Sequence, residues 1–138
     1  MKNKTKLFGL ILFVGLTVFG VQSCKKYENN QLINLNSRAE RVANTWKVEN
    51  YKINGDDYTS VVSDYSITYT KDGNYSFNTG LITGSGTWVF QNKDEEIKTT
   101  SINGQDVKTM IILKLEEKEF WYYYMVDENK NEFHLVQK

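Results

Sequence analysis

Apolar and polar residues alternate along most of the chain from residue 44 onward. The alternation is clear at Trp46 and Val48, at residues 65–70 and 75–77, and again toward the end at residues 133–136. A period of two is typical of strands that turn one face to a core, because successive side chains of a strand point to opposite faces. Residues 44–138 are therefore predicted to consist almost entirely of strands.

Turn sequences separate the apolar runs, at a spacing of about twelve residues per strand. Such turns are predicted at 71–74, 92–94, 103–104, 116–119 and 129–130. Counted with a weak strand at 59–62, the pattern predicts about eight strands. Tight turns without inserted helices require antiparallel neighbours, and closing the sheet would remove both of its edges. The expected fold class is all-β, an antiparallel up-and-down barrel of about eight strands with one short N-terminal helix.

Two later stretches matter for what lies inside the barrel. Apolar side chains recur at every second position from 107 to 115, so the following residues are predicted to line one face: Val107, Thr109, Ile111, Leu113 and Leu115. Residues 120–126 are instead apolar or aromatic on both faces. One face must enter the core, and we expect the helix near Ala39 and Val42 to cover the other. The alternative is a binding surface for a partner or a glycan.

The first residues of the chain have the pattern of a secretory signal. Lys2, Lys4 and Lys6 precede an uninterrupted apolar run from 7 to 21. The run is shorter than the roughly 17 to 25 residues of a membrane-spanning helix, so cleavage after residue 23 is favoured. Residues 21–24 resemble the bacterial lipobox, which implies that Cys24 becomes a diacylated N-terminus. Acyl chains on Cys24 would hold the protein on a membrane.

A tether and a short helix are predicted between Cys24 and the first strand. Residues 24–36 are polar and rich in Asn and Gln, which is typical of a flexible tether. Ser37 and Glu40 have the spacing of a capping box, in which each side chain bonds to the other residue's backbone amide. This spacing predicts a helix over residues 37–43 and a domain over 37–138.

Composition excludes several functions. The 138 residues include one Cys and one His, so no internal disulfide, Cys cluster or His pair for a metal is possible. No set of acid, base and nucleophile is recognisable, and no cofactor motif is present, so we expect neither an enzyme nor a bound cofactor. Cleavage after residue 23 would remove three of the 17 basic side chains and none of the 17 acidic ones, which leaves a net charge of −3. An acidic domain argues against nucleic acid as a partner.

Five parts of the chain carry a family resemblance. They are Asn44–Val48, Ile67–Tyr75, Gly86–Trp88, the region of Leu113, and Glu132–Leu135. In this order they resemble the lipocalin-like domain of small Bacteroidetes lipoproteins, over about residues 40 to 138. Asn44 stands where that family usually has Gly, and Tyr69 where Phe is common. The resemblance implies a lipocalin-like barrel on a lipid-anchored protein of the cell envelope, which we expect at the outer membrane, on either of its faces.

Two functions fit these expectations. In the first, the barrel binds a small hydrophobic ligand. The candidate wall residues are Trp46, Tyr65, Ile67, Tyr69, Tyr75, Phe77, Trp88, Ile111, Leu113, Tyr122 and Tyr124. In the second, side chains fill the interior and the surface binds an envelope protein, as an inhibitor, an accessory subunit or another interaction module. The resemblance favours the first.

Overall fold

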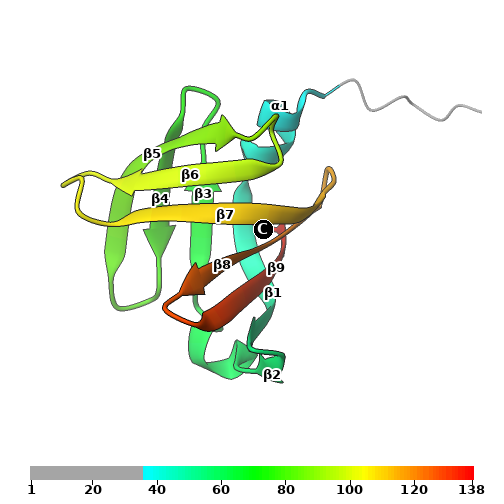
Figure 1. The fold of residues 1–138 in the computed structure, drawn as a ribbon, viewed down its shortest axis with the longest axis vertical. Helices are drawn as coiled ribbons and strands as arrows, with labels where there is room; N and C mark the ends of the chain where they lie inside the picture. Colours follow the sequence, from blue (N-terminus) through cyan, green and yellow to red (C-terminus); the bar gives the residue numbers. More distant parts are fainter. Residues whose placement is uncertain (1–35) are drawn as a thin grey trace, which may run out of the picture. The chain divides into compact units, whose positions relative to one another are not determined.

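Eight strands form a closed antiparallel barrel in the computed structural model, which describes residues 36–138 (Figure 1). The barrel strands are β1 (Thr45–Ile53), β3 (Ser66–Tyr69), β4 (Asn74–Asn78), β5 (Thr83–Gln91), β6 (Glu96–Ser101), β7 (Val107–Leu115), β8 (Glu119–Val126) and β9 (Asn129–Gln137). Each strand pairs with its neighbour along the chain, and β1 pairs with β9 to close the barrel. The short β2 (Asp56–Asp57) adds to one end of β1. The predicted all-β, antiparallel barrel is confirmed.

The predicted hairpin around residues 71–74 forms between β3 and β4. Gly73 has a φ of +83°, a conformation that glycine adopts without steric cost. The register pairs Tyr69 with Tyr75 and Ile67 with Phe77, so these four side chains share the inner face. The local turn chemistry is enough to set this part of the wall.

Residues 59–62 do not form the predicted weak strand. They form a 3₁₀ helix, η1 (Thr59–Val62). The Thr59 amide donates to the Asp57 carboxylate at 2.8 Å, and the Thr59 hydroxyl accepts from the Tyr51 amide at 3.0 Å. Side-chain bonds of this kind compete with the strand ladder, which accounts for the local turn.

The predicted inner face of β7 is wrong over most of its length. Met110 is buried opposite Ile97, whereas Leu113 lies on the outside and is 47% exposed. The pairing of β7 with β8 shifts between Ile112 and Lys114, so Leu115 returns to the inside opposite Phe120. A bulge inserts an extra residue and changes the alternation, so a strict period of two assigned the wrong face.

One end of the barrel is closed by the helix α1 (Arg38–Val42). The Ser37 hydroxyl accepts from the Glu40 amide, and the Glu40 carboxylate accepts from the Ser37 amide, so the capping box is present. The fully buried Val42 accepts a hydrogen bond from the Trp46 indole at 2.9 Å through its carbonyl. Arg38 bonds to the carbonyl of Asp94 in the β5–β6 turn, beside which α1 lies in Figure 1.

The aromatic strand β8 turns Phe120 and Tyr122 inward and Trp121 outward. Its outer face is covered differently from the expected burial under the helix. The Trp121 ring stacks on the His134 imidazole with centroids 4.1 Å apart, and the Lys114 ammonium lies 4.6 Å from the Trp121 centroid. Side chains of the neighbouring strands therefore cover this ring. In the part of the chain that the structure describes, no helix is long and apolar enough to span a membrane.

Candidate functional site

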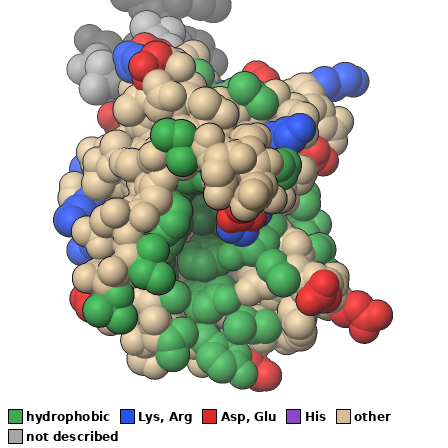
Figure 2. Space-filling view, turned by 90° about the vertical axis from the view of Figure 1, so that its left-hand side faces the viewer, with side chains coloured by type: hydrophobic (Ala, Val, Ile, Leu, Met, Phe, Trp, Pro, Cys, Tyr) green, Lys and Arg blue, Asp and Glu red, His purple; other side chains and the backbone are tan. Residues whose placement is uncertain are grey.

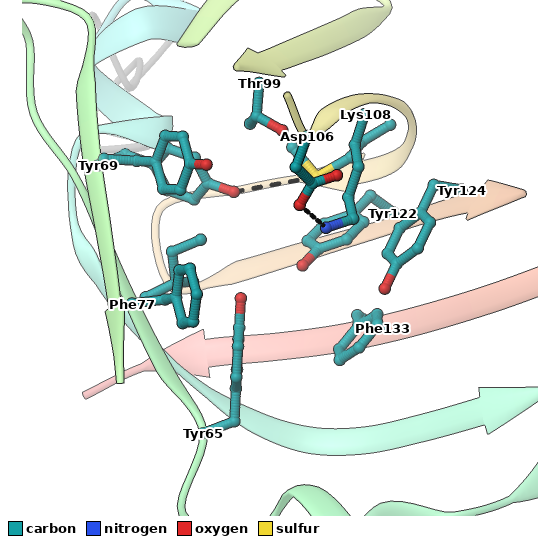
Figure 3. Close-up of a pocket in the computed structure, with 12 residues that line it drawn as sticks. Tyr65, Tyr69, Phe77, Thr99, Asp106, Lys108, Tyr122, Tyr124 and Phe133 are labelled. Atoms are coloured by element: carbon teal, nitrogen blue, oxygen red, sulfur yellow. Dashed lines mark hydrogen bonds and ion pairs between the residues drawn. The ribbon is translucent and has the colours of Figure 1, made fainter. Parts of the chain in front are cut away.

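A hollow lined by apolar side chains opens at the end of the barrel opposite α1 (Figure 2). Its volume is about 160 Å³. The lining comes from six strands, the β6–β7 connection and the segment before β3: Tyr65, Ile67, Tyr69, Tyr75, Phe77, Thr99, Asp106, Lys108, Met110, Tyr122, Tyr124 and Phe133 (Figure 3). Engineered apolar cavities of roughly 150 Å³ admit one benzene ring. The space therefore suits a single ring, and a larger ligand would extend past the mouth.

Seven of the predicted wall residues meet in this cavity. They are Tyr65, Ile67, Tyr69, Tyr75, Phe77, Tyr122 and Tyr124. Trp46 and Trp88 are buried in the barrel but lie outside the cavity lining. Trp88 meets the Tyr69 ring edge to face at 5.8 Å, and Trp46 meets Phe120 at 5.7 Å.

Ile111 and Leu113 were expected in the wall, and this expectation is wrong. The two side chains lie on the outer face of β7, in a shallow depression that Arg38 also lines. The inner positions next to them belong to Met110 and Ile112 instead. Pairing with Ile97 and Tyr122 sets this register, because slipping β7 by one residue would place Lys114 against Phe120.

Five lining residues were missed from the sequence: Thr99, Asp106, Lys108, Met110 and Phe133. Phe133 lies in the alternating run of residues 133–136, and this alternation was a usable signal. Thr99 lies on a strand whose sequence is mostly polar. Its neighbours Lys98 and Thr100 are also polar, so no alternation shows that Thr99 points inward. Asp106 and Lys108 gave no signal, because charged side chains near a turn are usually solvated.

Two glycines make room for the aromatic wall. Gly86 lies opposite Tyr75 in the strand pairing, and Gly84 lies opposite Phe77. A Cβ on Gly86 would lie 2.0 Å from the backbone oxygen of Thr100, and a Cβ on Gly84 would lie 2.4 Å from the Phe77 ring. The absence of a side chain at these two positions of β5 therefore lets the rings lie close over the sheet.

The phenolic hydroxyls of the cavity are unusual in having few partners. Tyr65, Tyr75, Tyr122 and Tyr124 make no hydrogen bond through their hydroxyls to any described residue, and the Tyr69 hydroxyl reaches only the Met110 sulfur at 3.9 Å. By contrast, Tyr51 lies outside the cavity and donates to Asn131 at 2.7 Å. Burial and the neighbouring phenols raise the pKa of Tyr65 and Tyr122, and the pKa of Tyr124 is raised to about 12. These hydroxyls stay protonated at neutral pH and can both donate and accept.

One ion pair stands at the mouth of the cavity. The Lys108 ammonium lies 2.7 Å from the Asp106 carboxylate, and both side chains are partly exposed. The same ammonium lies 5.9 Å from the centroid of the Tyr124 ring. Figure 3 shows the pair above the tyrosines. Because each charge has a partner, the pair adds polarity to the entrance without a strong net charge.

The cavity lining offers two kinds of contact to a ligand. Aromatic rings offer stacking surfaces, and the hydroxyls offer hydrogen bonds to a polar atom of a ligand. Among residues 36–138 no group of three or more His, Cys, Asp or Glu side chains has metal-site geometry. The predicted signal of residues 1–23, the tether up to residue 35 and the lipidated Cys24 lie outside the described residues. Comparison of the chain with models of known protein families and with curated proteins gives no match.

Proposed function

We propose that this protein is a lipid-anchored, lipocalin-like lipoprotein of the cell envelope whose barrel binds a small hydrophobic ligand. The observation that carries the proposal is the aromatic cavity at the open end of the barrel, with its unpartnered hydroxyls. Small-molecule sites are typically concave and apolar with a few polar groups that orient the ligand. The Asp106 and Lys108 charges neutralise each other, which suits an uncharged ligand at the mouth.

Ligand binding is tested with a probe and a matched pair of variants. The full chain in detergent micelles is analysed by native mass spectrometry for a co-purifying small molecule and is titrated calorimetrically with decanol against a micelle blank. Thr99→Leu adds an apolar side chain inside the cavity, whereas Thr109→Leu makes the same change on the outer face of β7. Overfilling a packed site costs about 1 to 3 kcal/mol, so we expect Thr99→Leu to weaken decanol binding about tenfold.

The control variant decides the interpretation. Thr109→Leu should bind decanol as the unmodified protein does. If the protein holds no small molecule and neither variant changes the heat of titration, the cavity is not a ligand site. The surface-interaction function would then be the better proposal.

The proposed anchor rests on the sequence of residues 2–24 and is tested separately. Acyl chains contribute about 0.8 kcal/mol per buried CH₂ to membrane affinity. We expect the Cys24→Ala protein to lose incorporation of labelled palmitate and to leave the membrane fraction once processed. Ser23→Ala keeps a small residue before Cys24 and should remain membrane-bound. A processed Cys24→Ala protein that still fractionates with membranes would rule out this anchor.

A further inference from the structure

The open end of the barrel differs from a simple apolar pocket in where its polar and apolar groups lie. Hydroxyls lie inside the cavity, and apolar side chains stand exposed around its mouth. Of the ten large apolar side chains exposed on residues 36–138, eight lie on connections or strand ends at the mouth: Tyr58, Val61, Leu81, Ile82, Ile102, Val107, Met125 and Val126. We call this group the apolar rim. Its most exposed members are Leu81, at 97% exposure, and Ile102, at 84%.

The rim is assembled from four separate parts of the chain. Tyr58 and Val61 come from the segment between β1 and β3, and Leu81 and Ile82 come from the β4–β5 turn. Ile102 belongs to the β6–β7 turn, and the remaining members stand where β7 begins and β8 ends. Figure 2 shows hydrophobic side chains gathered around the hollow on this face. Exposed apolar side chains that converge from separate turns mark a surface that contacts something apolar.

The tyrosine hydroxyls inside the cavity indicate a polar part of the ligand. Tyr122 is 2% exposed and Tyr75 is 8% exposed, yet neither hydroxyl has a partner among the described residues. These two hydroxyl oxygens are accessible, because among the described residues the buried side-chain nitrogen or oxygen without a partner is the Trp121 indole nitrogen. A ligand in the cavity that has oxygen atoms of its own can therefore bond to them. In Figure 3 the hydroxyls of Tyr65 and Tyr122 point into the same space. That space is large enough for one ring, and the mutually stacked rings of Tyr122 and Phe133 form part of its wall.

We infer that the pocket takes an amphiphile head first: a single oxygenated ring of the quinone or quinol type enters the cavity, and its apolar chain leaves across the rim. The tyrosine hydroxyls donate to the carbonyl oxygens of a quinone or accept from the hydroxyls of a quinol. The chain then covers Leu81, Ile82 and Ile102. The inference rests on the proposed ligand-binding function and adds the class and the orientation of the ligand.

Three probes separate the head from the chain. The full chain in micelles is titrated calorimetrically with a dimethoxymethylbenzoquinone that bears a decyl chain, with the same ring without the chain, and with decanol. If both parts contribute, we expect the chain-bearing quinone to bind at least about tenfold more tightly than the ring alone or decanol. A tenfold loss of affinity corresponds to about 1.4 kcal/mol for the contacts of the missing chain or ring. Equal affinity for decanol and the chain-bearing quinone would overturn the inference while leaving the proposed function in place.

Two double variants test where the ring and the chain of the ligand bind. Tyr65→Phe with Tyr122→Phe removes two hydroxyls and should weaken both ring-bearing probes at least about fivefold, because the ring oxygens lose their hydrogen-bond partners. Tyr123→Phe, on the outer face of β8, is the matched control and should change nothing. Leu81→Ser with Ile102→Ser should weaken the chain-bearing probe and spare the ring alone. Ring binding that is indifferent to the two inner hydroxyls, or chain binding that is indifferent to the rim, would contradict the head-first orientation.

Failure of the inference is distinguishable from failure of the proposed function. If decanol binds, is weakened by Thr99→Leu, and matches the chain-bearing quinone, only the ligand class is wrong. If none of the three probes produces binding heat above the micelle blank, the proposed function fails together with the inference. Either result is read from the same titrations.

Discussion

Individual tyrosines play two different roles in this barrel. Tyr51 stacks on Phe133 with centroids 4.3 Å apart and satisfies its hydroxyl on Asn131, so it is a structural residue. Tyr122 stacks on the same Phe133 ring at 5.5 Å, but its hydroxyl has no partner among the described residues. Burying a polar group is tolerated when a hydrogen bond compensates for lost water. The difference between the two hydroxyls therefore separates the packing core from the candidate site.

Gly86 shows how little space one position allows. A Cβ there would meet the Thr100 backbone oxygen, which cannot move aside as a flexible side chain can. We expect Gly86→Ala to lower the free energy of unfolding by about 1 to 3 kcal/mol, the usual cost of overpacking. Urea denaturation followed by tryptophan fluorescence measures the change. Ser85→Ala, its neighbour on β5, should stay within about 0.5 kcal/mol of the unmodified protein. Equal stability of the two variants would mean that β5 and β6 do not approach so closely at Gly86.

Among the elements, β7 and α1 decide what lies inside and what closes the barrel. Met110 and Ile112 point into the core, and after the irregular pairing that follows Ile112 it is Leu115 that points inward. The inward positions of β7 therefore change from even to odd residue numbers along the strand. The helix α1 is only five residues long and is held by its cap, by the buried Val42 and by the ion pair of Glu40 with Lys71 at 3.0 Å. Helices this short gain most of their stability from such contacts.

The cap of α1 provides an element-scale test. Ser37→Ala removes the hydroxyl that accepts from the Glu40 amide, and the loss of an N-cap costs about 1 kcal/mol. The amides of Arg41 and Ala43, which bond to Ser37 and Ala39, should then exchange about fivefold faster with solvent. Amide exchange followed by NMR measures this. Ser60→Ala, in the exposed part of η1, should leave both amides unchanged. Unchanged exchange in Ser37→Ala would show that tertiary contacts alone hold the helix.

The whole molecule has two chemically different ends. The α1 end carries ion pairs such as Glu40 with Lys71 and Lys114 with Glu119, the latter at 2.7 Å. The mouth also has an ion pair, Asp106 with Lys108, but it differs from the α1 end in carrying the apolar rim and the cavity. The predicted tether joins the barrel before Ser37, at the α1 end. The end that would bind a ligand is thus the end away from the attachment point of the chain.

The many buried phenols predict how the whole barrel responds to alkali. Burial raises the pKa of Tyr65, Tyr69 and Tyr122, and raises that of Tyr124 to about 12. An unfolded tyrosine has a pKa of about 10, so below that pH both states stay protonated and stability is unaffected. Above it the unfolded chain loses protons that the folded barrel keeps, so the free energy of unfolding falls as pH rises from about 10 and continues to fall toward 12.

Two measurements check this response. Urea denaturation should show a lower free energy of unfolding at about pH 11 than at about pH 8. Tyrosinate absorbance should lag behind that of free tyrosine until the barrel unfolds. If all the tyrosines of the folded protein titrate with the free amino acid, the cavity is more open to water than its burial indicates.

Local rules in the sequence by themselves determined several parts of this protein. The Gly73 hairpin, the Ser37 cap and the antiparallel order of the strands follow from short-range steric and hydrogen-bonding preferences, which need no distant partner. For the same reason seven wall residues could be named, because alternation on well-paired strands assigns their face. The closed, antiparallel barrel was predictable at this level.

The tertiary structure alone decided what depends on distant pairings. The irregular pairing near Leu113 lies where β7 pairs with β6 on one side and with β8 on the other. The alternation of apolar residues along β7 alone does not contain the register of these two pairings. The cavity, its mouth pair of Asp106 and Lys108, and the apolar rim are likewise assembled from turns far apart in the chain. Closure of the barrel places these turns at one end, because in an antiparallel meander every second connection returns to the same side.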